Sequence, residues 1–124
     1  MKTENLVVEK SYSFSLRIIK LYQYLKKKNE FELSSQILRS GTSISSNIEE
    51  AVGATSKKDF LAKISISYRE ARETKLWLRL LRDSNFIMAN EAESLLEDCD
   101  SLLRIIGSIQ KTTKLHLQSN NSKI

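Results

Sequence analysis

Apolar residues recur along most of this chain at spacings of three and four, which places their side chains on one face of an α-helix. Phe14, Ile18, Leu21 and Leu25 follow this spacing in the first such segment. The clearest repeat spans residues 92–109. Short polar stretches separate the segments. The pattern predicts four amphipathic helices, over residues 5–28, 31–53, 57–84 and 90–113.

The connections between these segments contain only a few residues, too few to cross the length of a helix. Successive helices must therefore run in opposite directions. We predict an all-α fold, an antiparallel up-down-up-down four-helix bundle that occupies residues 1–116 as one domain. Residues 117–124 are mostly polar and are predicted to form a disordered tail.

The second segment is the least ordinary, because its centre reads SGTSISSN over residues 40–47. Ser, Thr and Asn each cost a helix roughly 0.5 kcal/mol relative to Ala, and Gly costs about 1 kcal/mol. Local propensity therefore favours a loop. The apolar stripe of Leu33, Ile37, Ile44 and Ile48 nevertheless stays in phase across this centre. We predict one continuous helix, since packing often overrides propensity.

Composition excludes several other classes of protein. The chain has 124 residues, no proline and three glycines, whereas all-β folds need turn residues every ~8–12 positions. No apolar run approaches the roughly 20 residues of a membrane span. The first residues lack the apolar core of a secretion signal, and the single cysteine cannot form an internal disulfide. We expect a soluble, cytoplasmic protein without membrane contact.

The net charge of +5 is unevenly distributed, because basic and acidic segments alternate along the chain. On one interpretation, oppositely charged helices lie side by side and partly neutralise each other. On the other, the basic segments form a surface that attracts the phosphates of RNA or DNA. The residues that would then contact nucleic acid are Lys20, Lys26, Lys27 and Lys28 in the first helix, and Lys57, Lys58, Lys63, Arg69, Arg72, Arg79 and Arg82 in the third.

Residues typical of catalytic and metal sites are scarce. The only histidine, His116, borders the polar tail and is interpreted as a solvated side chain. Cys99 is in phase with the apolar stripe of the fourth segment and is interpreted as a buried structural cysteine. Di-iron and zinc sites need several ligands that this chain lacks. We expect no enzymatic activity, no metal and no cofactor.

A polar stripe accompanies the apolar face of the second segment, about 100° away from it. Small and amide-bearing side chains in such a line suit a buried or intersubunit hydrogen-bond network, whereas a plainly solvated face is the alternative. In the third segment, Trp77 and Leu80 lie off the apolar face, which indicates either a central helix or contact with another chain. The members of the polar stripe are Gln36, Arg39, Ser43, Asn47 and Glu50.

The sequence QILRSGTSISSNIEEA at residues 36–51 resembles the four-helix-bundle family named after the 23S rRNA intervening sequences that encode some members. The resemblance continues through KDF at residues 58–60 and EARET at residues 70–74, and covers roughly residues 5–112. By position it implies that the family's polar residues are Arg39, Ser43, Asn47 and Glu50, its anchor in the third helix is Phe60, and its acid there is Glu73.

The resemblance also implies a four-helix bundle that is often assembled into a homopentamer. No enzymatic activity is established for the family as a class. A related branch is the accessory protein of diversity-generating retroelements, a basic pentamer that binds a reverse transcriptase and nucleic acid. We therefore expect a non-catalytic homo-oligomer that binds RNA or DNA through its first and third helices. The alternative is an adaptor that docks a partner protein through the region of Trp77.

Overall fold

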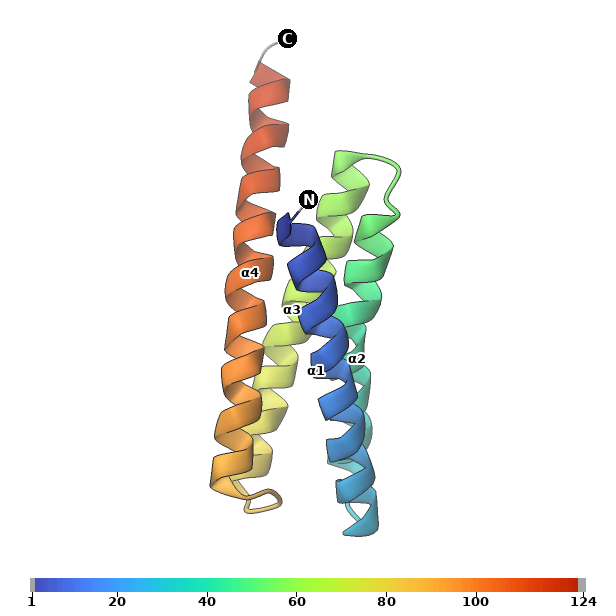
Figure 1. Ribbon diagram of the computed structural model, residues 1–124, viewed down its shortest axis with the longest axis vertical. Coiled ribbons are helices and arrows are strands. Elements are labelled where there is room, and N and C mark those ends of the chain that lie inside the picture. The colour runs from blue at the N-terminus through green and yellow to red at the C-terminus, as the bar shows by residue number, and fades with distance from the viewer. Residues whose placement is uncertain (1, 123–124) are drawn as a thin grey trace.

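A computed structural model describes residues 2–122 of the chain, and the side chains of residues 5–119. The described part contains four α-helices and no strand. Figure 1 shows them side by side, joined by short connections at alternating ends. The predicted all-α, antiparallel four-helix bundle is confirmed. The helices are α1 (Lys2–Lys27), α2 (Glu32–Val52), α3 (Lys57–Asp83) and α4 (Ala89–Ser122).

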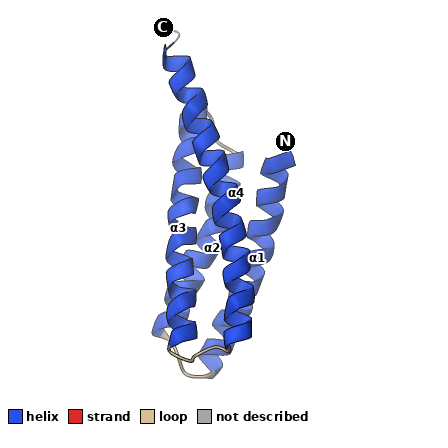
Figure 2. Cartoon of the chain, turned by 90° about the vertical axis from the view of Figure 1, so that its left-hand side faces the viewer, coloured by secondary structure: helices blue, strands red, loops and turns tan. Residues whose placement is uncertain are grey.

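The helices pack in a cycle, because α2 contacts α1 and α3, and α4 contacts α3 and α1. Their apolar faces meet along one central core, as the spacing of apolar residues predicts. Ile18, Ile37, Leu78 and Ile106 supply one fully buried side chain from each helix. Figure 2, seen from the side of α4, shows that all four helices run along the same long axis of the bundle.

The hydroxyl-rich centre of the second segment is one unbroken helix, so the prediction of continuity is confirmed. Gly41 lies buried at its middle, where α2 crosses α1 closely. A Cβ atom at this position would lie 2.8 Å from both Cγ atoms of Ile18. This distance is shorter than any normal contact, so only glycine fits without a shift of α1.

Two asparagines end α1 and α3 in the same way. Asn29 and Asn85 both have left-handed backbone, with φ angles of 62° and 63°. After α1, the N–H of Glu30 donates to the carbonyl of Leu25, and the N–H of Asn29 to that of Lys26. These bonds form a Schellman motif, and Asn85 repeats the pattern. Asparagine tolerates this conformation better than other residues that carry a Cβ.

The helix α3 begins at Lys57, as predicted, and Ser56 caps it. The Ser56 hydroxyl accepts a hydrogen bond of 3.0 Å from the N–H of Asp59. The Asp59 carboxylate in turn accepts one of 3.4 Å from the N–H of Thr55. Together they satisfy donors at the helix start that have no partner within the helix.

The fourth helix ends later than predicted, at Ser122 rather than near residue 113. Most of the predicted disordered tail is therefore helical in the structure, while residues 123 and 124 lie outside the described residues. The physical reason is that no helix-breaking residue follows Gly107. The C-terminal part of α4 extends past the other three helices (Figure 1).

Candidate functional site

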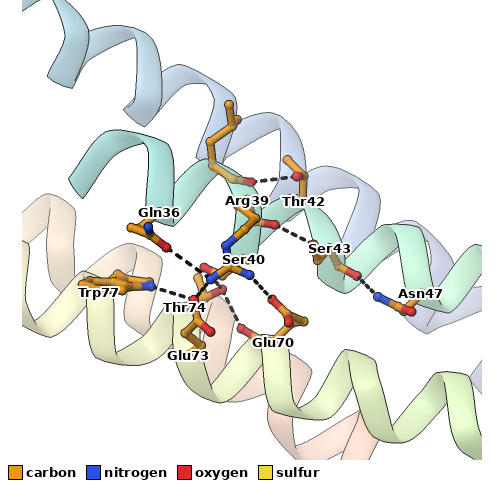
Figure 3. Close-up of polar contacts among 11 residues, drawn as sticks. Gln36, Arg39, Ser40, Thr42, Ser43, Asn47, Glu70, Glu73, Thr74 and Trp77 are labelled. Atoms are coloured by element: carbon orange, nitrogen blue, oxygen red, sulfur yellow. Dashed lines mark hydrogen bonds and ion pairs between the residues drawn. The ribbon is translucent and has the colours of Figure 1, made fainter. Parts of the chain in front are cut away.

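Arg39 is the centre of a polar network between α2 and α3 (Figure 3). Its guanidinium donates to the carboxylate of Glu70 at 3.2 Å and forms an ion pair with Glu73. The indole N–H of Trp77 donates to the same Glu73 carboxylate at 3.0 Å. Gln36 accepts a bond of 3.4 Å from Arg39. The structure thus brings together four predicted site residues and adds Glu70, which the polar stripe of one helix could not reveal.

The other half of the polar stripe does not reach a neighbouring helix. The Ser43 hydroxyl donates to the carbonyl of Arg39 at 2.6 Å, and the Asn47 amide donates to the carbonyl of Ser43 at 2.8 Å. These bonds stay within α2. Glu50 is exposed, and Phe60 packs partly buried against the core at the start of α3. The stripe is therefore a network with α3 at one end and a series of bonds within α2 at the other.

Hydrogen bonds from buried or half-buried hydroxyls join α2 to its neighbours, and sequence analysis missed them. The hydroxyls of Ser40 and Thr74 lie 2.9 Å apart between α2 and α3. Ser67 of α3 donates to the carbonyl of Ile44 at 2.9 Å. Ser15 of α1 and Ser45 of α2 are 2.6 Å apart. The signal that indicates them is a small hydroxyl residue at a position turned toward the core.

The predicted basic residues do not form one surface. Lys26, Lys27 and Lys28 lie at the end of α1, whereas Lys57 and Lys58 begin α3 at the opposite end of the bundle (Figure 1). Helices of this length separate the two groups by about 40 Å. Lys26 and Lys28 also stack on the rings of Tyr22 and Tyr24, at 5.3 and 5.5 Å from the ring centres.

Arg82 differs from the other predicted basic residues because acids neutralise its charge. It pairs with Asp83 at 2.8 Å and with Glu93 at 2.9 Å. Its hydrogen bond to Asp83, followed by the one to Glu93, raises the pKa of the guanidinium. The same bond lowers the pKa of the Asp83 carboxyl. Both side chains are charged at neutral pH, so Arg82 contributes little net charge to this surface.

One side of α3 carries basic residues that, within the described part of the chain, have no acidic partner. Lys58, Arg72 and Arg79 are exposed there and separated by multiples of seven residues. Pairs between α3 and α4, including Lys75 with Asp100 at 2.8 Å, fix the register of the two helices. In that register Arg72 of α3 lies at the same height along the bundle as the residues around Arg104 of α4. Six further basic residues also lack an acidic partner among the described side chains. Three were predicted, namely Lys20, Lys63 and Arg69, and three were not assigned by sequence analysis, namely Arg104, Lys111 and Lys114.

Cys99 and His116, the two residues considered for catalysis, have different surroundings. Cys99 is fully buried and donates to the carbonyl of Ala71 at 3.3 Å. Burial, followed by the charge of Asp100, raises the pKa of its thiol to about 12. The thiol is therefore protonated at neutral pH and unsuited to nucleophilic attack. His116 is exposed on α4.

The residues that the structure describes contain neither a metal-binding cluster nor a membrane-spanning helix. No group of three or more His, Cys, Asp or Glu side chains among them is placed to share a metal ion. No helix among them is long and apolar enough to cross a membrane.

Comparisons with known proteins converge on one family. The model of the family described as 23S rRNA-intervening sequence protein matches residues 3–108. A solved structure is also similar, that of a protein with unknown function from the S23 ribosomal protein family of Bacteroides thetaiotaomicron. The two chains are 43% identical, with a TM-score of 0.86, and the match covers 88% of this chain and 98% of the other. No curated protein matches.

Proposed function

The chain belongs to the family of 23S rRNA-intervening sequence proteins, and on this premise we propose that it is a non-catalytic, oligomeric protein that binds the phosphate backbone of RNA or DNA. The observation that supports this function best is the unpaired basic row of Lys58, Arg72 and Arg79 on α3. The row spans 21 residues, or about 32 Å of helix. That length approaches one turn of a nucleic-acid duplex.

Binding of this kind depends on charge rather than base sequence. The basic side chains lie on the outside of a straight helix, and no inserted loop or aromatic pair on the described surface of α3 accompanies them to read a base. Each phosphate contact releases a counterion, so affinity falls as salt rises. We therefore propose weak sequence preference and strong dependence on salt.

Oligomerisation is part of the same proposal, and it would strengthen the binding of nucleic acid. Each chain carries a net charge of +5, so a ring of five would carry roughly +25, enough to attract phosphate over a Debye length. Kinship with the accessory proteins of diversity-generating retroelements belongs to the proposal as well, since the resemblance implies a basic pentamer. Light scattering of the purified chain measures the subunit number, and a monomeric mass would refute this part.

The decisive experiment compares two triple variants that remove the same charge. The variant K58Q/R72Q/R79Q removes the unpaired row. The control K10Q/K75Q/R82Q removes three basic residues that already bond to Ser101, Asp100, and the pair Asp83 and Glu93.

Fluorescence anisotropy with a labelled RNA of about 20 nucleotides, from low to moderate salt, measures affinity and its salt dependence for each variant. The first triple should reduce the slope of log K against log salt by about 2, since single strands lose roughly 0.7 per contact. The control should retain most of the slope. Equal losses in the two variants, or no binding by the unaltered chain at low salt, would contradict the proposal.

A second candidate function is supported by exposed apolar residues near Trp77. Leu76 and Leu80 lie one turn apart on α3 and are 45% and 41% exposed. An adaptor would use them to dock a partner protein or another copy of the chain. Trp77 is the poorer test, because its indole holds Glu73 within the chain. The variant L76Q/L80Q should lower the mass in solution or abolish partner capture while RNA binding by the monomer persists.

A further inference from the structure

A pocket of about 500 Å³ lies between the α2–α3 connection and residues 108–116 of α4. Its apolar lining comes from Ala51 and Val52 at the end of α2, Phe60 of α3, and Ile109 of α4. The volume is within the range of small-molecule sites. One wall of the pocket is formed by residues 108–116 of α4, which run alongside the N-terminal part of α3, where Gln110 bonds to Ser65 at 3.0 Å.

Lys57 is the one lysine or arginine that lines this pocket. The other polar lining side chains are the imidazole of His116 and several hydroxyls, which can donate as well as accept: Thr55, Ser56, Ser108, Thr112 and Thr113. Lys57 lines it from α3, and His116 and Thr112 line it from α4. In the described part of the chain none of these three side chains has a hydrogen-bond or ion-pair partner, and all three are exposed. No acidic residue lines the pocket. Asp59, in the first turn of α3, bonds instead to the N–H of Thr55.

The two grooves between α1 and α4 differ from this pocket because acidic as well as basic residues line them. One, of about 530 Å³, places Glu91 opposite Arg17 and Lys20. The other, of about 390 Å³, contains both Lys10 and Asp98. Mixed charges of this kind favour no anion, and Arg17 already forms ion pairs with both Glu91 and Asp98.

We propose that the pocket at the end of α2 binds a small amphipathic carboxylic acid. Its apolar body would lie against Phe60 and Ile109, and its carboxylate would accept hydrogen bonds from Lys57, Thr112 and His116. The ligand is anionic because the basic side chain of Lys57 lines the opening and no acidic side chain does. It is apolar because the interior offers hydrocarbon contacts. This site is separate from the basic row on α3, and it does not depend on nucleic-acid binding.

Decanoate is the probe that tests this proposal, with decanol as the uncharged control of the same chain length. Isothermal titration of the full chain should show saturable binding of one decanoate per chain. Decanol should bind at least severalfold more weakly. Amide chemical-shift changes on addition of decanoate should gather at residues 51–57 and 108–116 rather than along α1.

Two matched lysines separate the specific contribution of Lys57 from general charge. K57Q should weaken decanoate binding about threefold to fivefold, the size expected of one exposed charge contact. K58Q, which changes the neighbouring exposed lysine outside the pocket, should leave it within error. T112W should fill the pocket and abolish binding, with its helical circular dichroism unchanged. Equal effects of K57Q and K58Q, equal binding of decanol, or shifts located in the α1–α4 grooves would overturn the proposal.

Discussion

The close approach of α1 and α2 at Gly41 gives a stability prediction whose sign the structure decides. Substitution of Gly41 by Ala normally stabilises a helix interior by about 1 kcal/mol. Here the new methyl would lie 2.8 Å from both Cγ atoms of Ile18, and 3.2 Å from its Cβ. Ile18 is fully buried and branched at the contact, so rotation of its side chain cannot relieve the clash.

Overpacking of this kind costs about 1–3 kcal/mol, so G41A should lose about 1 kcal/mol net after the gain in propensity. The other two glycines provide a graded comparison. A Cβ at Gly107 would lie 3.2 Å from the edge of the half-buried Tyr68 ring, and one at Gly53 would meet nothing closer than 3.8 Å. G107A should therefore change stability by less than about 1 kcal/mol in either direction, and G53A should change it little.

Urea unfolding followed by circular dichroism measures these differences in free energy. A double-mutant cycle then identifies the contact. I18V keeps both Cγ atoms and should not relieve G41A, whereas I18A removes both and should show favourable coupling with G41A. If G41A is as stable as the unaltered chain, or if I18V rescues it as well as I18A, the inferred steric contact is wrong.

Other predictions concern single features of the bundle. N29A should lower the melting temperature, since alanine resists a φ of 62° at a cost of about 1 kcal/mol, whereas N29G should preserve it. Thr74→Val should cost about 1–3 kcal/mol in urea unfolding because it leaves the buried Ser40 hydroxyl unpaired, and adding S40A should recover part of that loss. Cys99 should resist a thiol reagent at pH 8, below its raised pKa of about 12, and react promptly once urea unfolds the chain; fast reaction in the folded chain would contradict its burial.

Fold and network differ in how far the sequence predicts them. The bundle follows from apolar spacing, because a core-facing stripe recurs within each helix and needs no knowledge of its neighbours. The Arg39 network depends on which residues of α3 stand opposite Arg39, and that register is set by packing between helices. Glu73 and Trp77 entered the prediction separately, through the family resemblance and an off-core position, and only the fold joins them to Arg39.

Helix ends also differ in how far the sequence predicts them, according to whether their bonds are local or reach another helix. Ser56 was predictable as a cap because its partner Asp59 lies three residues away in sequence. Asn90 and Glu93 have the same spacing at the start of α4, yet Glu93 pairs with Arg82 of α3 and Asn90 accepts from the N–H of Glu91. A cap pattern therefore competes with any partner that a neighbouring helix brings within reach.

The centre of α2 explains why local propensity failed there. Relative to alanine, the seven small or polar residues within residues 40–47 cost an isolated helix about 4 kcal/mol. The same residues let α1 and α3 approach closely, since Gly41 receives Ile18 and the hydroxyls of Ser40 and Ser45 bond across the two interfaces. No buried side-chain polar atom among the described residues lacks a partner, so burial of these hydroxyls carries little penalty. The helix is thus stable only inside the bundle, and the sequence that weakens it alone is the one that fits it between its neighbours.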